Sequence, residues 1–72
     1  GPRFEAPFGY TPYRLGGFAP RPQYGARYWI NDPYRIGLPY AAPGLRWVRH
    51  YDDALLINMR TGQVRRVIRN VF

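Results

Sequence analysis

The fold is decided by residues 43–67, which read PGLRWVRHYDDALLINMRTGQVRRV. Three β-prone runs follow one another in this stretch: one around Trp47, one from Asp53 to Met59, and one that begins at Val64. Short runs that are divided by turn-forming residues are typical of an antiparallel meander. The sequence therefore predicts an all-β, β-dominated fold, built as a small twisted antiparallel sheet of three to four strands.

The middle run is apolar on both faces of the predicted strand, so we expect it to be the most buried strand of the sheet. The predicted structural core draws on all three runs and consists of Trp47, Leu55, Ile57, Val64 and Val67. The Asp52-Asp53 pair predicts a tight turn before the middle strand. Gly44 and Gly62 are predicted turn residues, with Gly62 at a positive φ that glycine adopts without steric cost.

The last run, Val64 to Phe72, has two interpretations. Its apolar residues have the i, i+3, i+4, i+7 spacing of an amphipathic helix. Against this, the run is rich in β-branched residues and follows directly after Thr61-Gly62, a hairpin-type turn. We predict a strand through about Ile68, with the helix as the alternative.

The first 27 residues are rich in proline, glycine and aromatic residues, and their prolines exclude long regular elements. Because solvated tails are normally poor in aromatic residues, we expect Tyr13 to Tyr24 to pack across the sheet. Residues 1–12 are predicted to be a flexible N-terminal arm, in which Gly1-Pro2 resembles the remnant of a cleaved tag. Residues 13–72 are predicted to be one β domain.

The segment between this arm and the sheet contains two further signals. Tyr28–Asn31 is a short β-prone run and a candidate fourth strand. Asp32-Pro33 ends it, and the Asp32 side chain is expected to accept hydrogen bonds from the backbone of a single helical turn that ends at Gly37.

The chain carries a net charge of +7, and all eleven basic residues are arginine. Arginine binds carboxylates and phosphates bidentately and stacks on aromatic rings, so an anionic surface partner is one interpretation. The predicted basic surface, on adjacent strands, consists of Arg46, Arg65, Arg66 and Arg69. The alternative is that these side chains serve solubility. No RNA-binding signature is present, so nucleic acid is not favoured.

Several functional classes are excluded by what the sequence lacks. No apolar run approaches the roughly 18 residues of a membrane span, so no transmembrane segment is predicted. Cysteine is absent, which excludes disulfides and thiolate metal sites. Serine is also absent and His50 is the only histidine, so a nucleophile and its base have almost no candidates. We predict no catalytic residues and no enzymatic activity.

Hard and borderline metal ligands gather at one place, where His50 is followed by Asp52 and Asp53. Nickel and cobalt bind imidazole and carboxylate groups, so these three residues are the predicted contacts of a weak nickel or cobalt site. One histidine cannot build a full site alone, and a solvated turn beside a histidine is the commoner arrangement. No other cofactor is predicted.

The order of motifs resembles the RcnB family of small exported bacterial proteins. The likeness spans about Tyr13 to Phe72 and is carried by Tyr28–Asp32, Gly37–Pro39, Pro43–Val48, Asp53–Ile57 and Thr61–Val64. It implies a periplasmic location, a signal peptide in the precursor, and a role in nickel and cobalt homeostasis. The matching residues at Gly44, Trp47, Asp53 and Gly62 are turn and core positions, so the resemblance assigns no binding residue.

These observations predict a non-enzymatic periplasmic accessory protein of the RcnB type. It would influence nickel and cobalt levels by modulating an envelope partner or by weak metal contact. The alternative is a basic aromatic binding module for an anionic envelope partner or nucleic acid.

Overall fold

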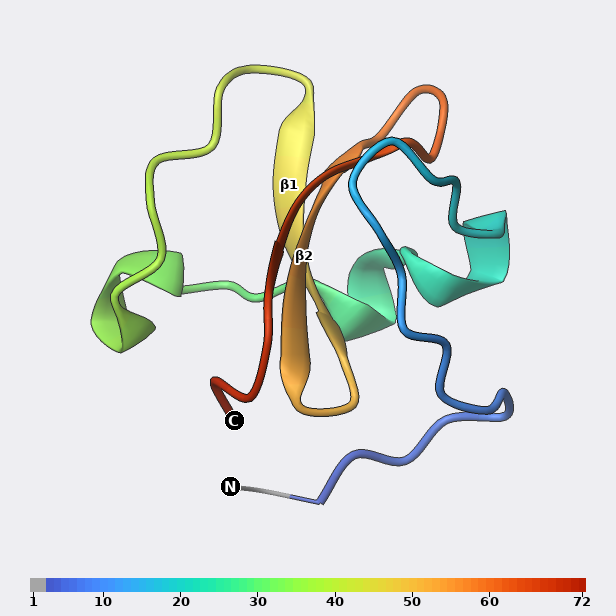
Figure 1. Cartoon of the computed structure of the whole chain (residues 1–72). Helices are drawn as coiled ribbons and strands as arrows, with labels where there is room; N and C mark the ends of the chain where they lie inside the picture. The colour runs from blue at the N-terminus through green and yellow to red at the C-terminus, as the bar shows by residue number, and fades with distance from the viewer. Residues whose placement is uncertain (1–2) are drawn as a thin grey trace.

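The computed structural model describes residues 3–72, which form a three-stranded antiparallel sheet in the order β1-β2-β3 (Figure 1). The strands are β1 (Leu45–His50), β2 (Asp53–Asn58) and β3 (Val64–Ile68). Three short 3-10 turns precede them: η1 (Arg21–Gln23), η2 (Ala26–Tyr28) and η3 (Pro33–Ile36). The predicted β-dominated meander is confirmed. The suggested tag remnant Gly1-Pro2 lies outside the described residues.

The last run of the sequence is a strand and not a helix. Val67 pairs with Leu55 and Ile68 pairs with Ala54, so β3 continues to Ile68 as predicted. The register shifts once, between Leu56 and Ile57, where β3 carries an extra residue. The strand preference of the β-branched residues in this run therefore outweighs the helical spacing of its apolar residues.

The predicted fourth strand at Tyr28–Asn31 is wrong. Only a single bridge forms there, between Trp29 and Val48, beside a hydrogen bond of 2.9 Å from the Ile30 N–H to the Trp47 carbonyl. Tyr28 belongs to η2, and Pro33 begins η3 shortly afterwards. Too few extended residues remain between these two turns to build a ladder.

The turns differ from prediction in detail. His50 pairs with Asp53, so the β1–β2 hairpin loop consists of Tyr51 and Asp52, one residue earlier than predicted, with Tyr51 at φ 56°. Asp53 is the first residue of β2 and only 3% exposed. Asp32 makes no side-chain cap to η3, but Gly37 ends that turn in the left-handed conformation as predicted.

The sheet is buried on both faces, and β2 is buried at five of its six positions. On one face, aromatic rings of the N-terminal segment cover the sheet; this layer contains Tyr13, Tyr24, Tyr28, Val48, Leu55, Ile57 and Val64. On the other face, Leu38 packs with Trp47, Ala54 and Leu56. The central strand is thus the most buried, as predicted.

The predicted core is consequently divided between two layers. Trp47 is 1% exposed, and its indole N–H donates to the Pro39 carbonyl at 2.8 Å. It lies on the opposite face of the sheet from Leu55 and Ile57. Val67 is half-buried at the edge of the first layer.

The N-terminal segment also covers the outer edge of β3 (Figure 1, blue beside orange). The Gly16 N–H donates to the Val64 carbonyl at 2.8 Å, and the Val64 N–H donates to the Gly17 carbonyl at 2.7 Å. Phe4 and Phe8 pack against the same layer as Tyr13. The flexibility of residues 1–12 stays a prediction. Within residues 3–72, no helix is long and apolar enough to cross a membrane.

Two turn glycines allow a matched test of this packing. Gly44 (φ 85°) and Gly62 (φ 81°) share a left-handed backbone, but a Cβ on Gly44 would meet open space. A Cβ on Gly62 would lie 2.8 Å from the Ala19 carbonyl oxygen and 3.0 Å from the Tyr24 ring. Gly44→Ala should cost about 1–2 kcal/mol from backbone strain alone. Gly62→Ala should cost clearly more in urea unfolding, because the N-terminal segment must move. Equal losses would contradict this packing.

Candidate functional site

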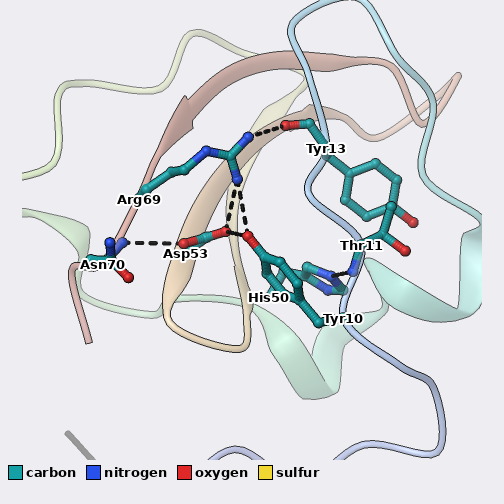
Figure 2. Close-up of polar contacts among 7 residues, drawn as sticks. All are labelled: Tyr10, Thr11, Tyr13, His50, Asp53, Arg69 and Asn70. Carbon is teal, nitrogen blue, oxygen red and sulfur yellow. Dashed lines mark hydrogen bonds and ion pairs between the residues drawn. The ribbon is translucent and has the colours of Figure 1, made fainter.

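The residues predicted to contact metal lie at the β1–β2 hairpin, but each already has partners within the protein. The Asp53 side chain is 4% exposed. Its Oδ2 accepts from the Tyr10 hydroxyl at 2.5 Å and from Arg69 Nη1 at 3.1 Å, while its Oδ1 accepts from the Asn70 backbone N–H at 3.1 Å (Figure 2). The carboxylate is therefore hydrogen-bonded at both oxygens and neutralised by a guanidinium.

Arg69 connects this carboxylate to the N-terminal segment. Its Nη1 donates to the Tyr10 hydroxyl at 3.1 Å, and its Nη2 donates to the Tyr13 carbonyl at 2.7 Å. Figure 2 shows these bonds linking Arg69, which follows β3, to the segment that contains Tyr10 and Tyr13. We call this set the polar clasp: Tyr10, Thr11, Tyr13, His50, Asp53, Arg69 and Asn70.

His50 is the most buried polar member of the clasp, at 1% exposure. Its Nε2 accepts the Thr11 backbone N–H at 2.9 Å, so the neutral ring carries its proton on Nδ1. Nδ1 is buried and has no hydrogen-bond partner among residues 3–72. The rings of Phe8 and Tyr10 lie nearly parallel to the imidazole, at centroid distances of 5.8 and 5.3 Å.

Protonation of His50 is opposed by this environment. Burial lowers the pKa of the imidazole below its ordinary value, and the neighbouring Asp53 carboxylate offsets only part of that effect. A proton on Nε2 would also turn this atom into a donor that faces the Thr11 N–H, and the hydrogen bond between them would be lost. The hydrogen bond to Asp53 raises the pKa of the Tyr10 hydroxyl, which remains a donor at neutral pH.

The third predicted ligand, Asp52, is separate from the other two. Its side chain is 64% exposed and lies 3.9 Å from Arg49 Nη2. Within residues 3–72, no group of three histidine, cysteine or acidic residues is placed to hold a metal ion. Direct metal contact by His50, Asp52 and Asp53 stays a prediction, and the clasp itself acts as a structural tie.

The four arginines of the predicted basic surface do not form one face. Arg46 lies on β1 and is exposed, with its guanidinium 4.0 Å from the centre of the Trp29 ring. Arg65 and Arg66 are exposed on β3. Because β2 lies between β1 and β3, the prediction that these arginines lie on adjacent strands is wrong. Arg69 contacts Asp53.

Sequence reasoning missed the N-terminal half of the clasp. Tyr10, Thr11 and Tyr13 lie in a segment without periodicity, about 40 residues before the hairpin that they contact. Arg69 was predicted to belong to the basic surface, because nothing in the sequence indicates which of the eleven arginines would neutralise Asp53. One signal was available in the sequence. Asp53 is an acidic residue at the start of a strand predicted to be buried, and a buried carboxylate requires a partner.

The buried His50 makes stability depend on pH in a defined direction. Its folded-state pKa lies below the ordinary value of about 6.5, so the unfolded chain binds the proton first as the pH falls. Its contribution is complete above about pH 6.5 and decreases toward the folded-state pKa. In urea unfolding, the wild type should lose stability as the pH falls below about 6.5, and His50→Gln should lose less. Parallel profiles would contradict this role.

Removing the clasp arginine should leave Asp53 as a buried carboxylate without its counter-charge. Arg69→Gln should cost about 1.5–3 kcal/mol of unfolding free energy, the usual range for losing hydrogen bonds to a charged group. Arg65→Gln removes the same charge from an exposed position on β3 and should change stability by less than about 0.5 kcal/mol. Equal effects of the two variants in urea unfolding would show that the clasp contributes nothing specific.

A known family model matches most of the chain. The family model RcnB, described as nickel/cobalt transporter regulator, matches residues 16–66, well over half of the 72-residue chain. No curated protein and no solved structure matches the chain significantly. The match covers the whole hairpin, including His50 and Asp53, and ends just before the Arg69 side of the clasp. The chain is a member of the RcnB family of nickel/cobalt transporter regulators.

Proposed function

We propose that this chain is a non-enzymatic accessory protein of the periplasm that regulates nickel and cobalt transport by binding an envelope protein, without capturing the metal itself. Membership of a family of transporter regulators supports the link to nickel and cobalt. The resemblance to exported bacterial proteins supports the periplasmic location.

The observation that carries the proposal is that Asp53 is already bound, by Tyr10, Arg69 and Asn70. A nickel ion at this carboxylate would have to displace the Arg69 guanidinium, which lies 3.1 Å from Oδ2. His50 could offer Nε2 only after the Thr11 N–H leaves it. Both changes would break contacts that hold the N-terminal segment on the sheet, so metal capture here works against the fold. Contact with a partner leaves the clasp intact.

Two further features agree with this proposal. A net charge of +7 repels divalent cations at long range. The one carboxylate beside the histidine is neutralised by Arg69, and such an ion-paired acid is a poor general base. Nucleic acid has less support as a target, because the predicted basic residues lie on opposite edges of the sheet.

The proposal is tested in a bacterial strain that lacks its own RcnB-family protein. Fused to an export signal, the chain should change nickel accumulation, measured by metal analysis of washed cells. The same chain without the signal should have no effect, because its partner lies in the envelope. Equal effects from both forms, or no effect from the exported form, would overturn the proposal.

A nickel titration of the purified protein tests the absence of metal capture separately. Backbone amide resonances of residues 50–53 should stay unshifted at micromolar nickel, since Asp53 and His50 are engaged. A saturable shift at micromolar nickel that His50→Gln abolishes would show direct coordination and contradict the partner-only mechanism.

A further inference from the structure

A groove outside the clasp combines apolar walls with a positively charged rim. It encloses about 270 Å³ between residues 3–5, residues 27–30 and Phe72. Four of its nine lining residues are aromatic: Phe4, Tyr28, Trp29 and Phe72. We call it the arginine-rimmed groove. Its volume is below the range of about 300–1,000 Å³ usual for small-molecule sites, so it fits one or two side chains better than a cofactor.

Three arginines surround this groove. The Arg27 guanidinium lies 5.8 Å from the centre of the Tyr28 ring, and Arg49 lies 4.4 Å from the centre of the Phe72 ring. Arg3 is 88% exposed at the other side. A guanidinium that stacks on a ring is held in one plane while its N–H groups can still bind a carboxylate.

The charge of the groove is unbalanced. Its single acidic residue, Glu5, lies 3.8 Å from Arg3. Arg49 is likewise paired, with Asp52 at 3.9 Å, in a protein whose net charge is +7. Arg27 is exposed, and the ion pairs found within residues 3–72 involve Arg3, Arg49 and Arg69. Arg27 is therefore the clearest candidate to meet a negative charge from outside.

The matching ligand must be anionic and apolar at the same time. A side chain that enters the groove would contact rings and Ile30, while a neighbouring carboxylate would reach the rim. A short acidic peptide segment with an aromatic or branched aliphatic residue has this chemistry. A nucleic acid backbone does not, because its charges need a longer track of cations than three arginines.

We infer that the arginine-rimmed groove is the docking site for an acidic, apolar segment of a partner protein. The inference rests on the proposed function, because it assigns the partner contact of that function to one place on the surface. Charge complementarity supplies orientation and the association rate, and ring burial supplies most of the affinity.

The inference is tested with an acetylated, amidated peptide of sequence Glu-Asp-Leu-Phe-Glu-Asp, titrated into the full chain and followed by NMR. The Trp29 indole N–H and the backbone amides of residues 27–30 should shift saturably. Arg27→Gln should weaken binding by about fivefold or more, as expected for losing one charge-assisted contact. Arg65→Gln, the matched charge change on β3, should alter the affinity by less than about twofold.

Three results would overturn the inference. In the first, no shift occurs at millimolar peptide. In the second, both arginine variants weaken binding equally, which would mean that only net charge matters. In the third, the neutral peptide Gln-Asn-Leu-Phe-Gln-Asn binds as tightly as the acidic one. Binding to phosphatidylglycerol vesicles through Arg27, with no binding of the peptide, would likewise replace a protein partner with a membrane surface.

The cellular nickel assay separates this inference from the proposed function. If the exported wild type changes nickel accumulation and Arg27→Gln does so equally, the groove inference fails and the function stands. If the wild type has no effect while the peptide binds through Arg27, the function fails and the groove stands as a peptide site. Loss of the nickel effect in Arg27→Gln, with Arg65→Gln unaffected, supports both.

Discussion

The structure depends on the need to bury one strand from both sides with a chain of 72 residues. β2 has apolar side chains on each face, and a three-stranded sheet has no second sheet to cover them. The covering layers are irregular segments with large aromatic side chains, each of which buries much surface per residue. The irregular segments carry backbone groups that need hydrogen-bond partners. Their backbone hydrogen bonds to the sheet edges and their bonds within the clasp provide these partners.

The need to bury β2 on both faces explains which parts of the fold could be predicted from the sequence. The meander was predictable because strand alternation and turn glycines are local signals, and Gly62 adopts the positive φ expected of it. The strand at Val64–Ile68 was predictable because its β-branched side chains favour extended backbone. The fourth strand failed for a local reason as well, since the 3-10 turns on each side of Trp29 took the residues it needed.

The site was less predictable because its geometry is set by long-range contacts. His50 and Asp53 were identified from their chemistry, but the residues that engage them come from a segment without periodicity. A histidine and an aspartate close together at a turn resemble a pair of metal ligands as long as their hydrogen-bond partners are unknown. Here a carboxylate and an imidazole that suggest metal binding are instead hydrogen-bonded to Tyr10 and Thr11 of the N-terminal segment. The proposed role in metal transport therefore rests on the protein's surface and not on these buried donors.

The way the sheet ends at its two outer strands has a separate consequence. β1 is met on its free side by the Trp29–Val48 bridge, and β3 by the Phe18–Gln63 bridge with the pairing of Gly16 and Gly17 to Val64. Open strand edges invite other chains to add to them, and here the protein occupies its own edges. A protease that removed the first 18 residues would expose the β3 edge together with the apolar layer beneath it. Such a truncated chain would be open to strand addition by other copies, so the N-terminal segment also protects the sheet against aggregation.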